Sequence, residues 1–169
     1  MVEKNSSMRQ LIDFRLEKLN RLKELGIEPF PHKYNPTHKS IYIISSFNDL
    51  EKQTVCVAGR IMALRKMGKA SFIHVMDDKG KIQIFIKKDN VGDKVYEAFS
   101  LMDIGDFIGV SGFVFKTQVG EISINAEKFD VLSKSIRPLP IVKEKEGEVY
   151  DAFKAVSYTH LTLPTKKRG

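Results

Sequence analysis

A single cysteine and the lack of any long hydrophobic run exclude two classes of protein from the start. Cys56 cannot form an internal disulfide bond, and a four-cysteine zinc site is excluded as well. It lies in a strand-like run, where we expect a small buried thiol. No apolar run approaches the roughly 20 residues that cross a bilayer, and the N-terminus lacks the hydrophobic stretch of a signal peptide. We therefore expect a cytoplasmic location and no membrane contact.

The sequence also has little that would hold a metal or carry out catalysis. The histidines are dispersed, without the close pairing of imidazole metal ligands: His32, His38, His74 and His160. The glycines form neither a P-loop nor a dinucleotide fingerprint, and no spacing suggests a serine, histidine and acid triad. Asp77 and Asp78 suggest a divalent-metal nuclease, but Lys79-Gly80 follows directly and the pattern is more typical of a hairpin turn. We predict no catalytic residue, metal site or cofactor in this chain.

What the sequence does have is an excess of basic residues. It contains 28 lysines and arginines against 21 aspartates and glutamates, which gives a formal net charge of +7 and a pI near 9.4. This balance favours a polyanionic partner, because basic side chains displace condensed counterions from phosphates. RNA, DNA and an anionic membrane all fit the charge alone.

The first part of the chain has the pattern of an amphipathic helix, from about Ser6 to Leu25. Its apolar residues fall within an arc of roughly 100° at helical periodicity: Leu11, Ile12, Leu19 and Leu22. Gly26 and two nearby prolines disfavour continuation, so we expect an extended linker after the helix. The helix is basic, with Arg15 and Lys18 among its charges, which makes it either a phosphate-contacting arm or an ordinary solvated surface.

From Thr54 onward, short β-type runs are separated by turn residues, as in a small antiparallel barrel. A segment with helical spacing, Val91 to Leu101, follows the third run. The expected strands are Val55 to Lys66, Ala70 to Met76, Lys81 to Lys87, Phe107 to Lys116, and Glu121 to Leu132. The order βββαββ is that of the OB fold, a five-stranded barrel whose second and third strands form a ligand face. We predict a mainly β protein with α: this barrel, preceded by the amphipathic helix.

The pattern divides the chain into four segments. Residues 1–53 hold the helix and the extended linker, and residues 54–133 hold the barrel. Residues 134–155 begin with a polar and then proline-stiffened stretch, which is typical of a linker between domains. Residues 156–169 have neither clear periodicity nor residues that extend a core, so we predict no structure for this tail.

Two residues on the expected ligand face suit the recognition of a single-stranded base. Phe72 offers a π-face for stacking, worth roughly 1–3 kcal/mol, although stacking alone scarcely distinguishes bases. Gln83 carries a donor and an acceptor, which match the N3–H and O4 groups of uracil, whereas cytosine presents the opposite pattern. Arg65, at the end of the first strand, would add a base or phosphate contact. A core phenylalanine and an ordinary surface glutamine are the alternatives.

Several separated motifs, in matching order, resemble lysyl-tRNA synthetases. They are Gly59-Arg60-Ile61-Met62-Ala63-Leu64-Arg65-Lys66-Met67-Gly68-Lys69-Ala70-Ser71-Phe72, Asp78-Lys79-Gly80-Lys81-Ile82-Gln83, Asp103-Ile104-Gly105-Asp106, Thr117-Gln118-Val119-Gly120-Glu121-Ile122-Ser123, and Leu132-Ser133-Lys134-Ser135-Ile136-Arg137-Pro138-Leu139-Pro140. The segment from Arg15 to Pro31 also resembles the family's leading helix and its exit. The likeness covers about residues 8 to 153.

The resemblance implies an N-terminal barrel that binds the anticodon stem-loop of tRNA-Lys, whose middle base is uridine. It implies that Phe72 is the stacking aromatic, that Gln83 lies on the uridine edge and that Arg65 lies beside it. Glu121 matches an acidic position implicated in lysine-anticodon recognition. The RNA-binding candidates are therefore Arg65, Phe72, Gln83, Glu121, Lys69, Arg15 and Lys18.

The resemblance also implies what lies beyond this chain. Full-length members continue into a catalytic domain that binds ATP and Mg²⁺ and attaches lysine to tRNA, and they form homodimers. That domain is not among these residues, and the tail after Phe153 looks foreign to the family. We therefore expect a truncated or chimeric chain that binds tRNA as a monomer and does not catalyse aminoacylation.

Two other functions stay open. A general single-strand-binding protein on the same fold would show steep salt dependence and little base preference. A barrel-based nuclease would use Asp77 and Asp78 with a magnesium ion.

Overall fold

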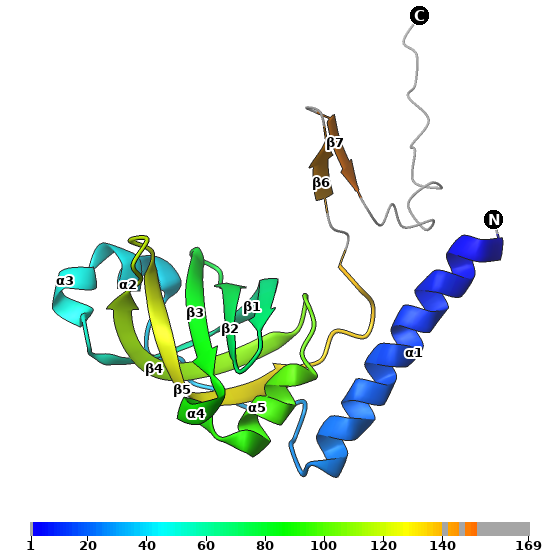
Figure 1. The fold of residues 1–169 in the computed structure, drawn as a ribbon, viewed down its shortest axis with the longest axis horizontal. Coiled ribbons are helices and arrows are strands. Elements are labelled where there is room, and N and C mark those ends of the chain that lie inside the picture. Colours follow the sequence, from blue (N-terminus) through cyan, green and yellow to red (C-terminus); the bar gives the residue numbers. More distant parts are fainter. Residues whose placement is uncertain (1, 140–141, 146–147, 152–169) are drawn as a thin grey trace, which may run out of the picture. The chain divides into compact units, whose positions relative to one another are not determined.

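The computed structural model describes residues 2–139, 142–145 and 148–151. The chain falls into two compact units, one up to Pro138 and one from Leu139 onward, and each is described by itself. The first unit contains the long helix and the barrel (Figure 1). The tail predicted for residues 156–169 lies outside the described residues.

The first helix, α1, spans Val2–Glu24 and ends where the sequence predicts. Gly26 has a φ of +71°, a left-handed conformation that glycine adopts without a steric penalty. The Gly26 N–H donates to Lys23 O at 2.9 Å, and the Ile27 N–H donates to Leu22 O at 3.1 Å. These two bonds close the helix in a Schellman motif. None of the helices in the described residues is long and apolar enough to cross a membrane.

The barrel has five strands, as predicted, and closes in the order β1-β2-β3-β5-β4 (Figure 1). The strands are β1 Thr54–Met67, β2 Ala70–Met76, β3 Lys81–Lys87, β4 Phe107–Lys116 and β5 Ile122–Ser133. The predicted helix between β3 and β4 is two short helices, α4 Lys88–Val91 and α5 Asp93–Ser100. Gly92, with a φ of +86°, separates them, because that backbone conformation cannot continue a helix.

The barrel core follows the two-residue period of the strands. One face of β2 and β3 is buried, and the alternate residues point outward. The buried apolar residues are Ile73, Val75, Ile82, Ile84 and Ile86. In β1 this alternation ends at Ile61, where a bulge between Ile61 and Ala63 shifts the pairing with β2. Beyond the bulge most of β1 is exposed, including Arg65, and Leu64 is the residue that still packs against the core.

The segment between α1 and the barrel is not simply an extended linker, so that prediction was incomplete. It contains α2 Ser40–Ser45 and α3 Phe47–Leu50, and Ile43 of α2 is fully buried. Asp77 holds α2 against the turn between β2 and β3. Its carboxylate accepts hydrogen bonds from the Ser40 N–H and hydroxyl, and from the Lys79 and Gly80 N–H groups, at 2.7–2.9 Å.

These contacts give Asp77 the turn role that the sequence favours over a nuclease role. Burial of the Asp77 carboxyl acts to raise its pKa, but the hydrogen bonds from Ser40 and from the turn outweigh it and hold the pKa below its usual range. Among the described side chains, no three His, Cys, Asp or Glu residues come together as metal ligands.

Tyr34 packs the same segment against the barrel. A Cβ on Gly109 would lie 2.2 Å from the Tyr34 ring, so only glycine leaves room for this contact. The Tyr34 hydroxyl lies 3.1 Å from Cys56 Sγ, and burial together with this contact raises the pKa of Tyr34. Cys56 is only half-buried, so the expectation of a buried thiol was wrong. The Cys56 side chain points away from the barrel core and contacts Tyr34.

The second unit contains a small two-stranded antiparallel sheet, β6 Val142–Lys145 and β7 Glu148–Asp151. Residues 134–155 were predicted to form a linker without strands. Runs of four residues are too short for a two-residue period to be recognised against the surrounding charges.

Candidate nucleic-acid interface

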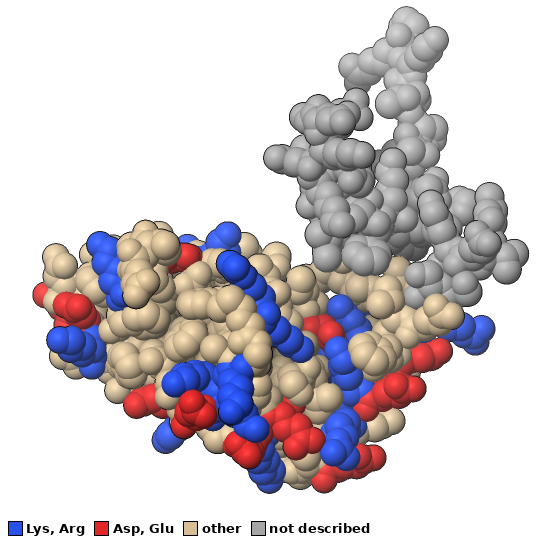
Figure 2. Space-filling view, viewed as in Figure 1, with Lys and Arg blue, Asp and Glu red and all other residues tan. Residues whose placement is uncertain are grey.

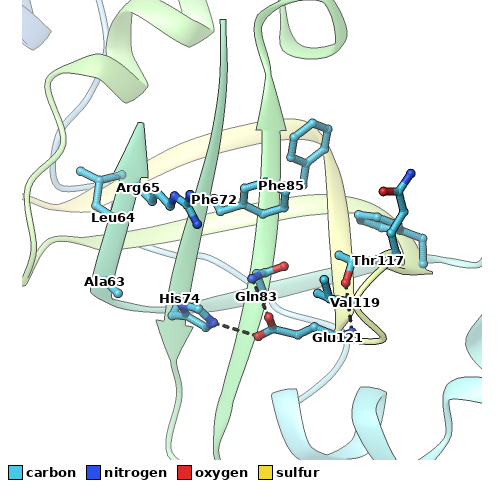
Figure 3. A pocket seen from close by; sticks show the side chains of 12 residues that line it. Ala63, Leu64, Arg65, Phe72, His74, Gln83, Phe85, Thr117, Val119 and Glu121 are labelled. Atoms are coloured by element: carbon cyan, nitrogen blue, oxygen red, sulfur yellow. Dashed lines mark hydrogen bonds and ion pairs between the residues drawn. The ribbon is translucent and has the colours of Figure 1, made fainter. Parts of the chain in front are cut away.

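A pocket of about 740 Å³ lies on the outer face of β1, β2 and β3, next to the loop between β4 and β5 (Figure 3). The strands contribute Arg65, Phe72, His74, Gln83 and Phe85, and the loop contributes Thr117, Val119 and Glu121. The strand side chains gather on one face because residues paired directly across neighbouring strands point to the same side of a sheet.

The first of two rows across this face is aromatic, with a cation at its edge. Arg65 of β1 pairs with Phe72 of β2, which pairs with Phe85 of β3. The Phe72 and Phe85 ring centroids are 4.9 Å apart, and Phe115 of β4 lies 6.4 Å beyond Phe85 in an edge-on orientation. Phe72 and Phe85 are half-buried, so each ring packs on its neighbour and still offers surface to a ligand.

The second row is polar and lies next to the first. His74 of β2 pairs with Gln83 of β3, which pairs with Ser123 of β5. The Gln83 amide donates from Nε2 to Glu121 Oε2 at 2.8 Å and accepts at Oε1 from the Ser123 hydroxyl at 2.8 Å. His74 Nε2 lies 2.9 Å from the other Glu121 oxygen (Figure 3). The amide is thus held before any ligand is present.

Glu121 is in turn fixed by the loop that carries it. The Thr117 N–H donates to Glu121 O at 2.9 Å, and the Glu121 N–H donates to the Thr117 hydroxyl at 3.0 Å. Gly120, with a φ of +89°, makes the turn between them possible. Val119 at the loop tip is 89% exposed and forms an apolar rim of the pocket.

The structure brings four of the seven predicted RNA-binding residues together. Arg65, Phe72, Gln83 and Glu121 all line the pocket. Lys69 is exposed in the turn between β1 and β2, outside the pocket lining. Figure 2 shows that lysine and arginine side chains are dispersed over the visible face, with acidic side chains beside many of them.

Arg15 and Lys18 lie in α1 away from the pocket, and their contacts are internal. Arg15 is 8% exposed, and its guanidinium donates to the backbone oxygens of Ser135 at 2.7 Å and Ile104 at 3.1 Å. Lys18 Nζ lies 2.6 Å from Asp103 Oδ1. The geometry therefore gives both residues the task of joining α1 to the barrel, and it does not support the predicted phosphate contacts.

Lys134 completes this helix-to-barrel cluster. Its fully buried side chain lies 2.6 Å from both Asp103 and Asp106. Burial of the Asp103 carboxyl opposes its ionisation, but the ammonium groups of Lys134 and Lys18 outweigh burial and hold the pKa of Asp103 below its usual range.

Arg15 was predicted to bind RNA because of its charge and its position on a basic helix. Neither property reveals whether a side chain faces solvent or a neighbouring loop.

Sequence reasoning missed several pocket residues. Phe85 and His74 were within reach, because counting outward from Met76 and Lys81 across the turn places Phe85 opposite Phe72 and His74 opposite Gln83. Ser123 and Phe115 carried no such signal, since their positions depend on pairings between strands that are distant in sequence.

The closed five-stranded barrel and its aromatic and polar pocket define an OB-fold nucleic-acid-binding domain. Residues 55–132 match the tRNA anticodon family, described as an OB-fold nucleic acid binding domain. Over most of its length, the chain is also homologous to the N-terminal region of lysine–tRNA ligases, which confirms the resemblance noted in the sequence.

Three such relatives illustrate the match. The chain is 47% identical to the lysine–tRNA ligase of Pelotomaculum thermopropionicum over 137 residues, which cover 81% of the chain and 27% of the relative. The chain is 48% identical to the lysine–tRNA ligase of Carboxydothermus hydrogenoformans, over 80% of the chain and 28% of the relative. It is 46% identical to that of Bacillus subtilis, over 76% of the chain and 27% of the relative. The chain thus matches about a quarter of the length of these curated relatives.

Proposed function

We propose that this chain binds the anticodon loop of tRNA-Lys through the pocket on the β1–β3 face. The observation that carries the proposal is the adjacency of Phe72 and Gln83. One supplies a π-face for an unstacked base, and the other supplies a held amide with both a donor and an acceptor. The homology to lysine–tRNA ligases supports tRNA as the nucleic acid.

Each pocket residue has a distinct part in this proposal. Phe72 stacks on the middle base of the anticodon, and Phe85 backs its ring. Gln83 reads the N3–H and O4 groups that distinguish uracil from cytosine. Arg65 is exposed at the end of the aromatic row, where its guanidinium can reach a base edge or a phosphate. Lys69 lies farther out and adds a phosphate contact that carries no base preference.

The activity of a whole lysine–tRNA ligase is a further proposal. In a protein that includes the remaining length of the relatives, we infer that the barrel delivers tRNA-Lys to a catalytic domain that uses ATP and Mg²⁺. Such a protein acts in the cytoplasm as a homodimer. The barrel by itself binds RNA and does not catalyse aminoacylation.

The test is a pair of anticodon stem-loops that differ only in the middle base. The chain is titrated into fluorescently labelled UUU and UCU stem-loops at two salt concentrations, and binding is followed by anisotropy. We expect tighter binding of UUU at both salt concentrations, since base contacts are less sensitive to salt than phosphate contacts. Equal affinity for the two loops would reject anticodon reading and leave a general single-strand-binding protein.

A further inference from the structure

The orientation of the Gln83 amide decides which base it matches. With its N–H group and its oxygen in one arrangement, the amide complements the N3–H and O4 groups of uracil; a 180° flip presents the reverse pattern, which complements cytosine. A freely rotating glutamine therefore cannot discriminate between the two pyrimidines. Discrimination requires neighbours that hold one orientation.

The neighbours of Gln83 fix that orientation by their chemistry. The Glu121 carboxylate can only accept a hydrogen bond, so the end of the amide that faces it at 2.8 Å must be the NH₂ group. At the other end, the Ser123 hydroxyl lies 2.8 Å from Gln83 Oε1 and 3.3 Å from Glu121 O. The shorter contact identifies the Gln83 oxygen as its acceptor. A flipped amide would set its oxygen against the Glu121 carboxylate, and its NH₂ group could bond Ser123 only if the hydroxyl turned its proton to Glu121 O, a longer contact of 3.3 Å.

Ser123 differs from Glu121 because it cannot reach a ligand. It is fully buried, and it pairs directly with Gln83 across the parallel β3–β5 junction. Once these two hydrogen bonds are made, the amide still has one N–H and one oxygen lone pair for a base. Any effect of Ser123 on base preference must therefore act through the residues that it contacts, Gln83 at 2.8 Å and the Glu121 backbone at 3.3 Å.

We propose that Ser123 is a positioning residue for base discrimination, which together with Glu121 locks the Gln83 amide in the uracil-matching orientation. This inference rests on the proposed function. It assigns to Glu121 a second task besides any direct contact with RNA, and it assigns to His74 the support of the Glu121 carboxylate.

The experiment measures the ratio of affinities for the UUU and UCU stem-loops in the Ser123→Ala variant of the full chain. We expect this ratio to fall about fivefold, the effect of one neutral hydrogen bond, with little change in the dependence of binding on salt. Ser123→Thr keeps a donating hydroxyl and should restore the ratio. Ser71→Ala is the matched control, because Ser71 is also fully buried, in β2, but bonds to Tyr96 instead of Gln83.

A second variant keeps the proposal testable if Ser123→Ala does not fold. Glu121→Gln preserves the shape of the side chain but can offer either oxygen or NH₂ to Gln83, so it should also lower the ratio. A chain without base preference would reject the proposed function itself. If the unmodified chain prefers UUU and a folded Ser123→Ala variant keeps that preference in full, only the positioning role is rejected. If Ser123→Ala does not fold, full preference in Glu121→Gln rejects the positioning role in the same way.

Discussion

Replacing Phe72 by leucine separates stacking from the packing of the barrel. Leucine keeps much of the apolar volume that fills the space beside Phe85, but it has no π-face. The Phe72 ring is half-buried, with its centroid 4.9 Å from that of Phe85, so part of the ring remains available to a base. Loss of base stacking costs roughly 1–3 kcal/mol, which corresponds to an affinity about 5-fold to about 150-fold lower.

Stacking is nearly indifferent to base identity, which makes the prediction sharper. Phe72→Leu should weaken binding of the UUU and UCU stem-loops by the same factor and leave their ratio unchanged. Both affinities are measured by anisotropy, and the urea midpoint reports whether the barrel stays folded. Phe85→Leu is the comparison, because it removes the ring that supports Phe72 while leaving Phe72 in place. Binding of Phe72→Leu within twofold of the unmodified chain would refute the stacking role.

Three further changes have defined outcomes. Gln83→Ala should abolish most of the preference for UUU over UCU while lowering total affinity less than Phe72→Leu does, as measured by the same titrations. Lys134→Ala leaves the fully buried Asp106 carboxylate without its cation and the partly buried Asp103 with Lys18 alone, and it should lower the free energy of unfolding by about 3–5 kcal/mol in urea. The pKa of Asp103 is lower in the folded state than in the unfolded state. The stability that Asp103 gives the folded chain is therefore fully present above the unfolded pKa of about 3.9, and it is lost as the pH falls through the folded pKa. Thermal unfolding of the Asp103→Asn variant should therefore depend less on pH below about 4 than that of the unmodified chain.

The strand order and the C-terminal end of α1 were predictable because their signals are local. The two-residue alternation along β2 and β3 needs only the neighbouring residues, and Gly26 marks the end of the helix in the sequence itself. The turn at Asp77 fixes the register of the β2–β3 hairpin, which is why Phe72 and Gln83 could be placed on one face. The positions of Phe72, His74, Gln83 and Phe85 in the pocket therefore followed from a register that the sequence itself contains.

The remaining pocket residues depend on contacts that no local pattern records. Ser123 lies beside Gln83 only because β5 joins β3 in parallel, a pairing 40 residues apart along the chain. Arg15 shows the same dependence on distant contacts. It has the charge and the position of an RNA-binding residue, but it donates to a backbone oxygen 120 residues away. Composition predicted a polyanionic partner, and only the folded chain shows which cations are already engaged in internal contacts.

The arrangement of the pocket separates affinity from specificity. In the proposed function, the aromatic row binds any base, whereas the polar row discriminates between bases through one amide. Since Glu121 and Ser123 hold that amide before a ligand arrives, binding does not have to immobilise the Gln83 side chain, a saving of about 0.5–1.5 kcal/mol for a residue of this kind. The same contacts raise the free energy of the flipped amide, which under the proposed positioning role is the state that a cytosine would need. Pre-organisation therefore strengthens binding of the matching base and disfavours the mismatched one through a single set of hydrogen bonds, and a variant that loosens Gln83 should lose both advantages together.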